Sequence, residues 1–116
     1  MKNLHESQCE ACLKDAPTLN EVELSKLQPE IPAWVVVESE SVKQLIREYA
    51  FLNFASALAF ANVVGELAEQ QGHHPAITVE WGRATVSWWT HEIGGLHKND
   101  VIMAAKTDVL FREFSS

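Results

Sequence analysis

The chain has little of what several large classes of protein require. Its 116 residues include five Gly and four Pro and contain no internal repeat, which excludes collagen-like and low-complexity proteins. Apolar runs such as Ala57–Ala61 are far shorter than the roughly 20 residues of a membrane-spanning helix. Lys and Arg total nine against sixteen Asp and Glu, so the net charge is −7, and no basic cluster exists. Because an acidic surface repels nucleic acid and anionic membranes, we expect neither as a partner.

The remaining composition, 47% hydrophobic and 22% charged, is that of a folded domain. The first residues carry His, Glu and Lys where a signal peptide would need an apolar core, so we expect a cytoplasmic protein. We expect residues 1–16 to form a flexible tail and residues 17–116 to form one domain, with Pro17 at the boundary.

Both cysteines, Cys9 and Cys12, lie in the expected tail as a C-x-x-C pair. Such a pair is typical of a redox dithiol or of half a zinc site. Glu6 and Glu10 would oppose the thiolate that redox chemistry needs. His5 adds only a third local ligand, whereas a closed zinc site takes four. Reduced thiols in a mobile tail are the third interpretation.

Caps, turn residues and hydrophobic periodicity divide the domain into helices and strands. The first half predicts a short helix to about Leu27, a buried strand over Trp34–Val37, a strand over Val42–Phe51, and a helix from its cap Asn53 to Gln71. Gly72 suits the left-handed position just past a helix end. We expect two adjacent apolar stripes on the second helix: Phe54, Leu58 and Ala61, and Phe60, Val63 and Leu67.

The second half predicts a hairpin and a last helix. Ile77, Val79 and Trp81 alternate with polar residues, which indicates a half-buried strand. A two-residue turn at Gly82-Arg83 leads to a return strand over Ala84–Thr90, and a helix capped by His97 or Asn99 runs to about Phe114. The predicted fold is α+β, a four-stranded, largely antiparallel sheet with helices packed on one face.

Histidines gather between the second helix and the hairpin. Pro75 pushes the preceding residue toward an extended backbone, so His73 and His74 are expected to point to opposite sides and to have unequal roles. The predicted hairpin brings His91 to the same end of the sheet. Glu69, on the last turn of the second helix, can orient an imidazole.

Clustered histidines allow three interpretations, and the spacing leaves all three open. Three imidazoles are typical of an open catalytic zinc site, although neighbours in an extended chain diverge from one metal. A histidine titrating near neutral pH can give and take protons in acid–base catalysis. Each imidazole can also be structural, bonded to backbone or solvent.

The full pattern resembles the signature of a known family. Glu69, His73-His74-Pro75, Trp81, His91 and Asp100 stand at the spacing found in the pterin-4a-carbinolamine dehydratases, also called 4a-hydroxytetrahydrobiopterin dehydratases, of the bacterial type. The likeness extends from about Thr18 to Phe111 and includes the segment Trp88–His97.

That resemblance implies an activity and a mechanism. Members are hydro-lyases that remove water from 4a-hydroxytetrahydropterin and give quinonoid dihydropterin, which is then recycled for aromatic amino acid hydroxylation. The reaction implies no metal and no cofactor, because the ring nitrogens help to expel the hydroxyl. One proton must reach that hydroxyl and another must leave N5, which suits histidine general acid–base catalysis.

The resemblance also implies roles for single residues. His73, His74 and His91 are the expected catalytic residues, with His74 the most important for pterin binding and proton transfer. Four residues are expected to bind substrate or to support the histidines: Glu69, Pro75, Trp81 and Asp100. Core packing is the expected role of Trp81. Asp100 suits both catalysis and the first turn of a helix, where an acid is favourable, and the sequence leaves that choice open. His97, outside the signature, is expected to cap a helix or to face solvent.

Partners follow from the same resemblance. We expect a homodimer or homotetramer, a pterin substrate and a functional link to phenylalanine hydroxylase. The alternative function is a protein-binding dimerisation cofactor, or transcriptional coactivator, that uses a helix surface. Metal-dependent hydrolysis and activity on a different pterin also remain open.

Overall fold

The computed structural model describes residues 19–90 and 94–115 of the chain. The predicted tail with Cys9 and Cys12, and the predicted catalytic residue His91, lie outside the described residues. The elements follow in the order α1 (Glu21–Leu27), the 3₁₀ turn η2 (Gln28–Glu30), β1 (Val35–Ser39), β2 (Val42–Ala50), α2 (Phe54–Gln71), β3 (Ala76–Glu80), β4 (Arg83–Trp88) and α3 (Lys98–Ser115).

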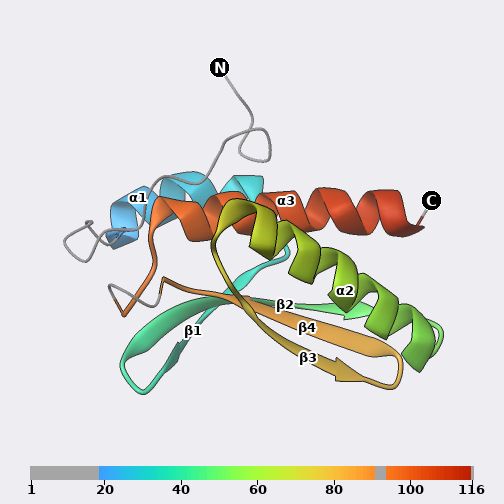
Figure 1. Ribbon diagram of the computed structural model, residues 1–116. Coiled ribbons are helices and arrows are strands. Elements are labelled where there is room, and N and C mark those ends of the chain that lie inside the picture. The colour runs from blue at the N-terminus through green and yellow to red at the C-terminus, as the bar shows by residue number, and fades with distance from the viewer. Residues whose placement is uncertain (1–18, 91–93, 116) are drawn as a thin grey trace.

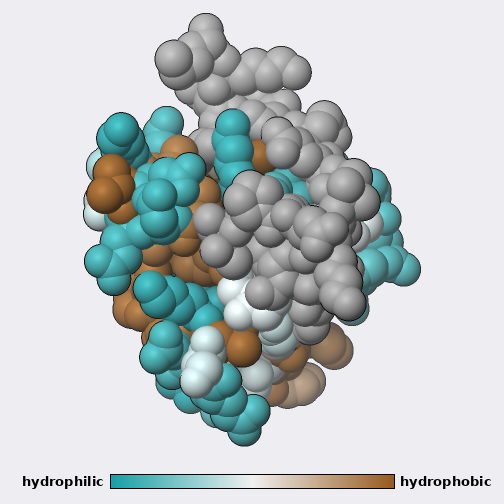
Figure 2. All heavy atoms as spheres, turned by 90° about the vertical axis from the view of Figure 1, so that its left-hand side faces the viewer, coloured by the Kyte–Doolittle hydropathy of each residue, from teal (hydrophilic) through white to brown (hydrophobic). Residues whose placement is uncertain are grey.

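The predicted α+β fold is confirmed. The four strands form one antiparallel sheet in the order β1-β2-β4-β3. All three helices lie on one side of this sheet, and no described element covers the other side (Figure 1). On the face shown in Figure 2, hydrophilic residues surround smaller hydrophobic areas. Among the described helices none is both long and apolar enough to cross a membrane.

The predicted ends of α2 are in place, and α1 also begins at a side-chain cap. Asn20 begins α1 with a capping box, in which its side chain and that of Glu23 each accept the other's backbone N–H. Asn53 begins α2 by accepting the N–H of Ser56, and Gly72 ends it in the left-handed conformation. These local signals set the ends of the helix that leads into the histidines.

The strand predicted as buried is a sheet edge. Among the described strands β1 pairs only with β2. Its residues Val35 and Val37 are exposed on the uncovered side of the sheet, whereas Val36 faces the helices. The prediction of a buried strand was wrong because three successive valines read as apolar on both faces, while only one face of this sheet is covered.

The β3–β4 turn lies one position earlier than predicted. Arg83 pairs with Glu80, so the two turn residues are Trp81 and Gly82, with the glycine second at a φ of +75°. A one-residue shift moves Trp81 out of the strand and into the turn. Its side chain is 74% exposed, and the expected core packing of Trp81 was therefore wrong.

The core lies between the sheet and the helices. Ala84, Val86 and Trp88 of β4 are fully buried on the predicted face. The buried residues of α2 are Ala57, Phe60, Ala61, Val64 and Ala68. The stripe containing Phe54 and Leu58 was predicted wrongly, because both side chains are exposed on the face turned away from the sheet.

A buried carboxylate fastens α3 to the sheet. Oδ1 of Asp108 accepts hydrogen bonds from Trp34 Nε1 at 3.0 Å, Arg47 Nη1 at 2.6 Å and Tyr49 Oη at 2.7 Å. The guanidinium of Arg47 also lies over the Tyr49 ring, 4.4 Å from its centroid. Burial, together with the neighbouring Asp108 charge, raises the pKa of Tyr49 well above its ordinary value. These contacts fix the helix that carries Asp100 at its other end.

Candidate active site

The side chains of the two histidines that follow α2 point in opposite directions. Gly72, at a φ of +64°, turns the chain out of the helix, and His73 and His74 follow in the connection before β3 begins. His73 is 5% exposed, whereas the side chain of His74 is 60% exposed. The prediction that the two imidazoles point to opposite sides is confirmed.

His73 forms a buried pair with a carboxylate of α3. Its Nε2 lies 2.6 Å from Oδ1 of Asp100, which is completely buried. A carboxylate only accepts hydrogen bonds, so it favours the tautomer with a proton on Nε2. The imidazole also stacks on the indole of Trp88, with centroids 5.8 Å apart and planes inclined by 6°. Three elements therefore hold this ring.

The second carboxylate oxygen of Asp100 accepts hydrogen bonds at the start of α3. Oδ2 accepts a hydrogen bond from Thr90 Oγ1 at 2.8 Å and one from the backbone N–H of His97 at 2.8 Å. His97 in turn accepts the N–H of Asn99 at its Nδ1, at 3.1 Å. The two bonds resemble a capping box with a histidine in the first position, except that His97 accepts the N–H of Asn99 rather than that of Asp100. The predicted cap role of His97 is confirmed, and Asp100 serves the helix and His73 at once.

His74 forms an exposed pair with a carboxylate of α2. Its Nε2 lies 2.5 Å from Oε2 of Glu69, whose side chain is 77% exposed. Glu69 occupies the last turn of α2, so the helix end and the extended segment after it bring the two groups together. This pair faces solvent, where an imidazole can exchange protons with water or with a bound molecule.

The structure thus brings most of the predicted site residues to one end of the sheet. Pro75, half-buried, leads from the two histidines into β3. Trp81 lies beyond the opposite end of β3 and is separate from this cluster. Sequence reasoning missed Thr90, whose only signal was a hydroxyl residue directly before His91, and it missed the contact of Trp88 with His73.

The two described histidine–carboxylate pairs do not converge on one point. Each described histidine of the cluster has its own carboxylate partner, and the two rings point apart. Over residues 19–90 and 94–115, no three His, Cys, Asp or Glu side chains are close enough together to hold a metal ion. What the described groups can do is hold and move protons, since each imidazole is oriented by a carboxylate.

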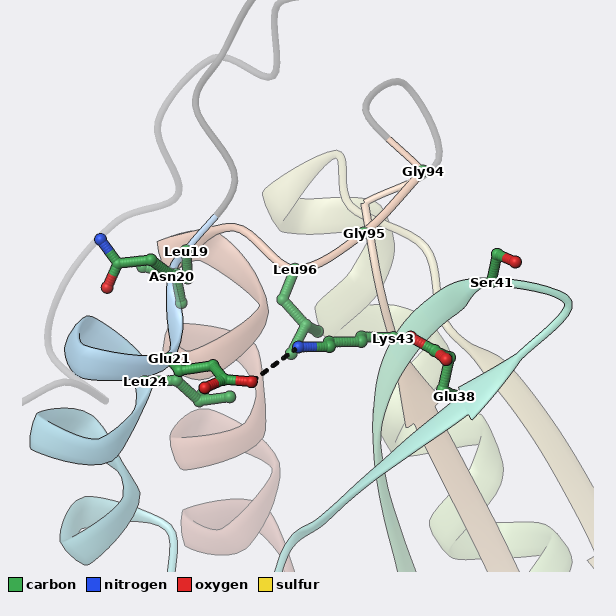
Figure 3. Close-up of a pocket in the computed structure, with 10 residues that line it drawn as sticks. All are labelled: Leu19, Asn20, Glu21, Leu24, Glu38, Ser41, Lys43, Gly94, Gly95 and Leu96. Carbon is green, nitrogen blue, oxygen red and sulfur yellow. Dashed lines mark ion pairs between the residues drawn. The ribbon is translucent and has the colours of Figure 1, made fainter.

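A separate hollow of about 220 Å³ lies between the start of α1, the β1–β2 turn and Gly94–Leu96. In Figure 3 the Lys43 side chain extends across it toward Glu21, and the nitrogen–oxygen distance is 3.9 Å. Leu19, Leu24 and Leu96 also line the hollow. Neither His73 nor His74 is among the described residues that line it, so the hollow lies apart from the two described histidine–carboxylate pairs.

Comparison with known proteins gives the family. The family model described as pterin 4 alpha carbinolamine dehydratase matches residues 17–110. A protein of Marinobacter nauticus named after these dehydratases is 52% identical over 111 residues, which cover 96% of this chain and 100% of the relative. A protein of Nitrosococcus oceani with the same name is 53% identical over 112 residues, covering 97% and 99%.

Solved structures share the fold at lower identity. The crystal structure of a transcriptional coactivator/pterin dehydratase from Brucella melitensis superposes with a TM-score of 0.71 at 24% identity, covering 81% of this chain and 98% of that one. A pterin dehydratase-like protein, described as a RuBisCO assembly factor of the α-carboxysome, gives a TM-score of 0.57 at 23% identity, covering 67% and 88%. From the matched family model and the two relatives that are covered over nearly their full length, this chain belongs to the pterin-4-alpha-carbinolamine dehydratase family.

Proposed function

We propose that this chain is a hydro-lyase that dehydrates 4a-hydroxytetrahydropterin, and that His73, His74 and His91 are its catalytic residues. Among the observations, the pair of adjacent imidazoles carries the proposal. His73 and His74 point apart, and each is bound to a carboxylate, one buried and one exposed. Two groups in such different surroundings suit a reaction that delivers one proton and removes another.

The reaction needs two proton transfers and no change of oxidation state. The bond between C4a and the hydroxyl oxygen breaks, and a proton delivered to that oxygen lets it leave as water. A base removes the proton from N5, and its electron pair forms the new double bond to C4a. The product is quinonoid dihydropterin. Acid–base catalysis contributes about 10²–10⁴-fold to such a reaction.

His74 is the proposed proton carrier. Its imidazole is exposed to solvent, and Glu69 orients it from the last turn of α2. His73 is held more firmly, because Asp100 fixes one ring nitrogen and Trp88 stacks on the ring. A buried carboxylate that fixes the tautomer of a catalytic imidazole is a known device of acid–base enzymes. In the proposal His91 supplies the third imidazole.

The proposed setting is the recycling of tetrahydropterin for an aromatic amino acid hydroxylase such as phenylalanine hydroxylase. The proposed assembly is a homodimer or homotetramer. Support for an interface between copies comes from Leu52, Phe54 and Leu58, which are large apolar side chains exposed around the start of α2.

Carbinolamine dehydration can be measured directly. Phenylalanine hydroxylase would generate the intermediate, and its ultraviolet absorbance would be followed with wild type, His74→Ala, Val22→Ala or no added protein. We expect wild type and Val22→Ala to accelerate decay equally, because Val22 is exposed on α1, which takes no part in the described hydrogen bonds of His73 and His74 with their carboxylates. We expect His74→Ala to lose about 100-fold or more of the acceleration. A folded wild type that leaves the spontaneous rate unchanged would exclude the dehydratase function.

The second candidate is a protein-binding cofactor. The two solved neighbours are described as a coactivator and as an assembly factor, which are roles of those proteins with protein partners. In this chain the exposed apolar residues around the start of α2 favour the same class of function. This candidate predicts that His74→Ala leaves partner binding unchanged while Leu58→Glu abolishes it, which the dehydratase alone does not require.

A further inference from the structure

We propose that Thr90, which lies outside the family signature, is a positioning residue that holds the Asp100 carboxylate in the plane that His73 needs. The proposal rests on the proposed dehydratase function and adds to it a residue that acts through Asp100. Thr90 is completely buried, and its hydroxyl lies 2.8 Å from Oδ2 of Asp100. The opposite oxygen of the same carboxylate lies 2.6 Å from His73 Nε2.

The first step of the argument is the geometry of the carboxylate. Oδ2 of Asp100 has two donors, the Thr90 hydroxyl and the His97 backbone N–H, both at 2.8 Å. Two donors on one oxygen fix the rotation of the carboxylate about its bond to Cβ, and this rotation sets the direction of Oδ1. With the hydroxyl removed, a single donor remains and the carboxylate can turn away from His73.

The second step is the chemistry of the buried hydroxyl. Burying a hydroxyl is unfavourable unless it is hydrogen-bonded, and a valine fills nearly the same volume without that cost. A β-branched residue suits this end of the sheet whether or not it carries oxygen. The hydroxyl of Thr90 therefore serves its partner, and the partner is Asp100.

The third step is the backbone of the same residue. The N–H of Thr90 donates to the carbonyl of Gly95 at 2.8 Å, and the N–H of Gly95 donates back at 3.4 Å. This bridge brackets the four-residue segment 91–94, which includes the proposed catalytic residue His91. The backbone of Thr90 is thus paired with Gly95 while its side chain contacts Asp100.

Three substitutions separate the hydroxyl from the shape of the side chain. Thr90→Val keeps the shape and removes the donor, Thr90→Ala removes donor and branch, and Thr90→Ser keeps the donor. We expect Thr90→Val and Thr90→Ala to lower kcat about tenfold with little change in KM, because misorientation of a catalytic group affects the chemical step. We expect Thr90→Ser to stay within about twofold of wild type.

Two further readouts distinguish positioning from simple support of the fold. In the hydroxyl-free variants the acid limb of the kcat–pH profile should move, because Asp100 would face His73 with less of its charge neutralised. The NMR signal of the His73 imidazole proton that faces Asp100 should shift or exchange faster in Thr90→Val and stay as in wild type in Thr90→Ser. This signal does not depend on turnover.

Each outcome decides one question. A wild type without dehydratase activity overturns the proposed function, and the NMR signal alone then decides whether Thr90 positions Asp100. Equal kcat, pH profile and imidazole signal in Thr90→Val and wild type overturn the positioning role. Failure of both hydroxyl-free variants to fold, with Thr90→Ser folded, also overturns it, because the hydroxyl would then serve the fold as a whole.

Discussion

The two histidine–carboxylate pairs are neighbours in sequence and opposites in environment. His73 and Asp100 meet in the core at 2.6 Å, whereas His74 and Glu69 meet at 2.5 Å in solvent. The distances are nearly equal, so the difference lies in what surrounds them. Asp100 has further donors on its second oxygen, and His73 is stacked on Trp88. For Glu69, the contact with His74 is the hydrogen bond that the described structure gives it.

This contrast teaches that proximity alone does not fix a side chain. An exposed pair is screened by water and ions and contributes little to stability. A buried pair is held by its surroundings, and removing one partner leaves the other charged or polar group without compensation. One imidazole of the proposed site is therefore rigid and the other is adaptable, although both follow the same helix.

The largest expected effect is on the free energy of unfolding, and it comes from removing each of the two carboxylates in turn. Asp100→Ala should lower the free energy of unfolding by about 3–5 kcal/mol, because a buried pair loses one member. The matched change Glu69→Ala should lower it by less than about 1 kcal/mol. Urea denaturation followed by tryptophan fluorescence measures both. Similar losses in the two variants would show that burial does not distinguish the pairs.

A second prediction concerns Tyr49, whose phenol contacts Asp108, the other buried carboxylate of α3. It compares the pKa of this phenol in the folded protein with its pKa in the unfolded chain. Burial first, and the Asp108 charge second, raise the pKa of Tyr49. The unfolded phenol loses its proton near pH 10 while the folded one keeps it. The contribution to stability is therefore complete below about pH 10 and is lost above it, by up to about 1.4 kcal/mol per pH unit.

Tyr49 is the single tyrosine of the chain, which makes this prediction simple to check. Phenolate absorbance should appear only together with alkaline unfolding, and Tyr49→Phe should show a shallower loss of stability with pH. Phenolate absorbance in a chain that circular dichroism shows to be folded would contradict the raised pKa.

The smallest expected effect concerns the residue that precedes both histidines. Gly72 ends α2 at a φ of +64°, and nothing lies within 4 Å of the position that an alanine Cβ would take. Gly72→Ala should therefore cost about 1 kcal/mol, from backbone strain alone. The control Gly65→Ala, in the helix interior with open space around it, should be neutral or stabilising. A thermal melt that ranks the two variants in the opposite order would contradict this explanation.

The sequence predicted helix ends and side-chain directions well where they depend on residues within a few positions along the chain. Asn20, Asn53, Gly72 and His97 stand at helix ends because their side chains or backbone freedom satisfy groups within a few residues. The opposite directions of His73 and His74 followed from the extended backbone before Pro75. These features needed no knowledge of the rest of the molecule.

The misses have one physical cause, which is that burial is decided by distant parts of the chain. Val35 and Val37 read as core residues but face the side of the sheet that no described helix covers. Trp81 read as a strand residue, and a turn one position earlier placed it in solvent. The partnership of Thr90, Asp100 and His73 joins three elements, so no local pattern could have indicated it.

The sharing of Asp100 between a helix start and an imidazole has a consequence for how this protein can change over generations. Selection for a firmly begun α3 and selection for a well-oriented His73 act on the same codon, so neither trait can drift independently of the other. Position 69 carries no such double duty in the described contacts. Position 100 should therefore tolerate less change than position 69.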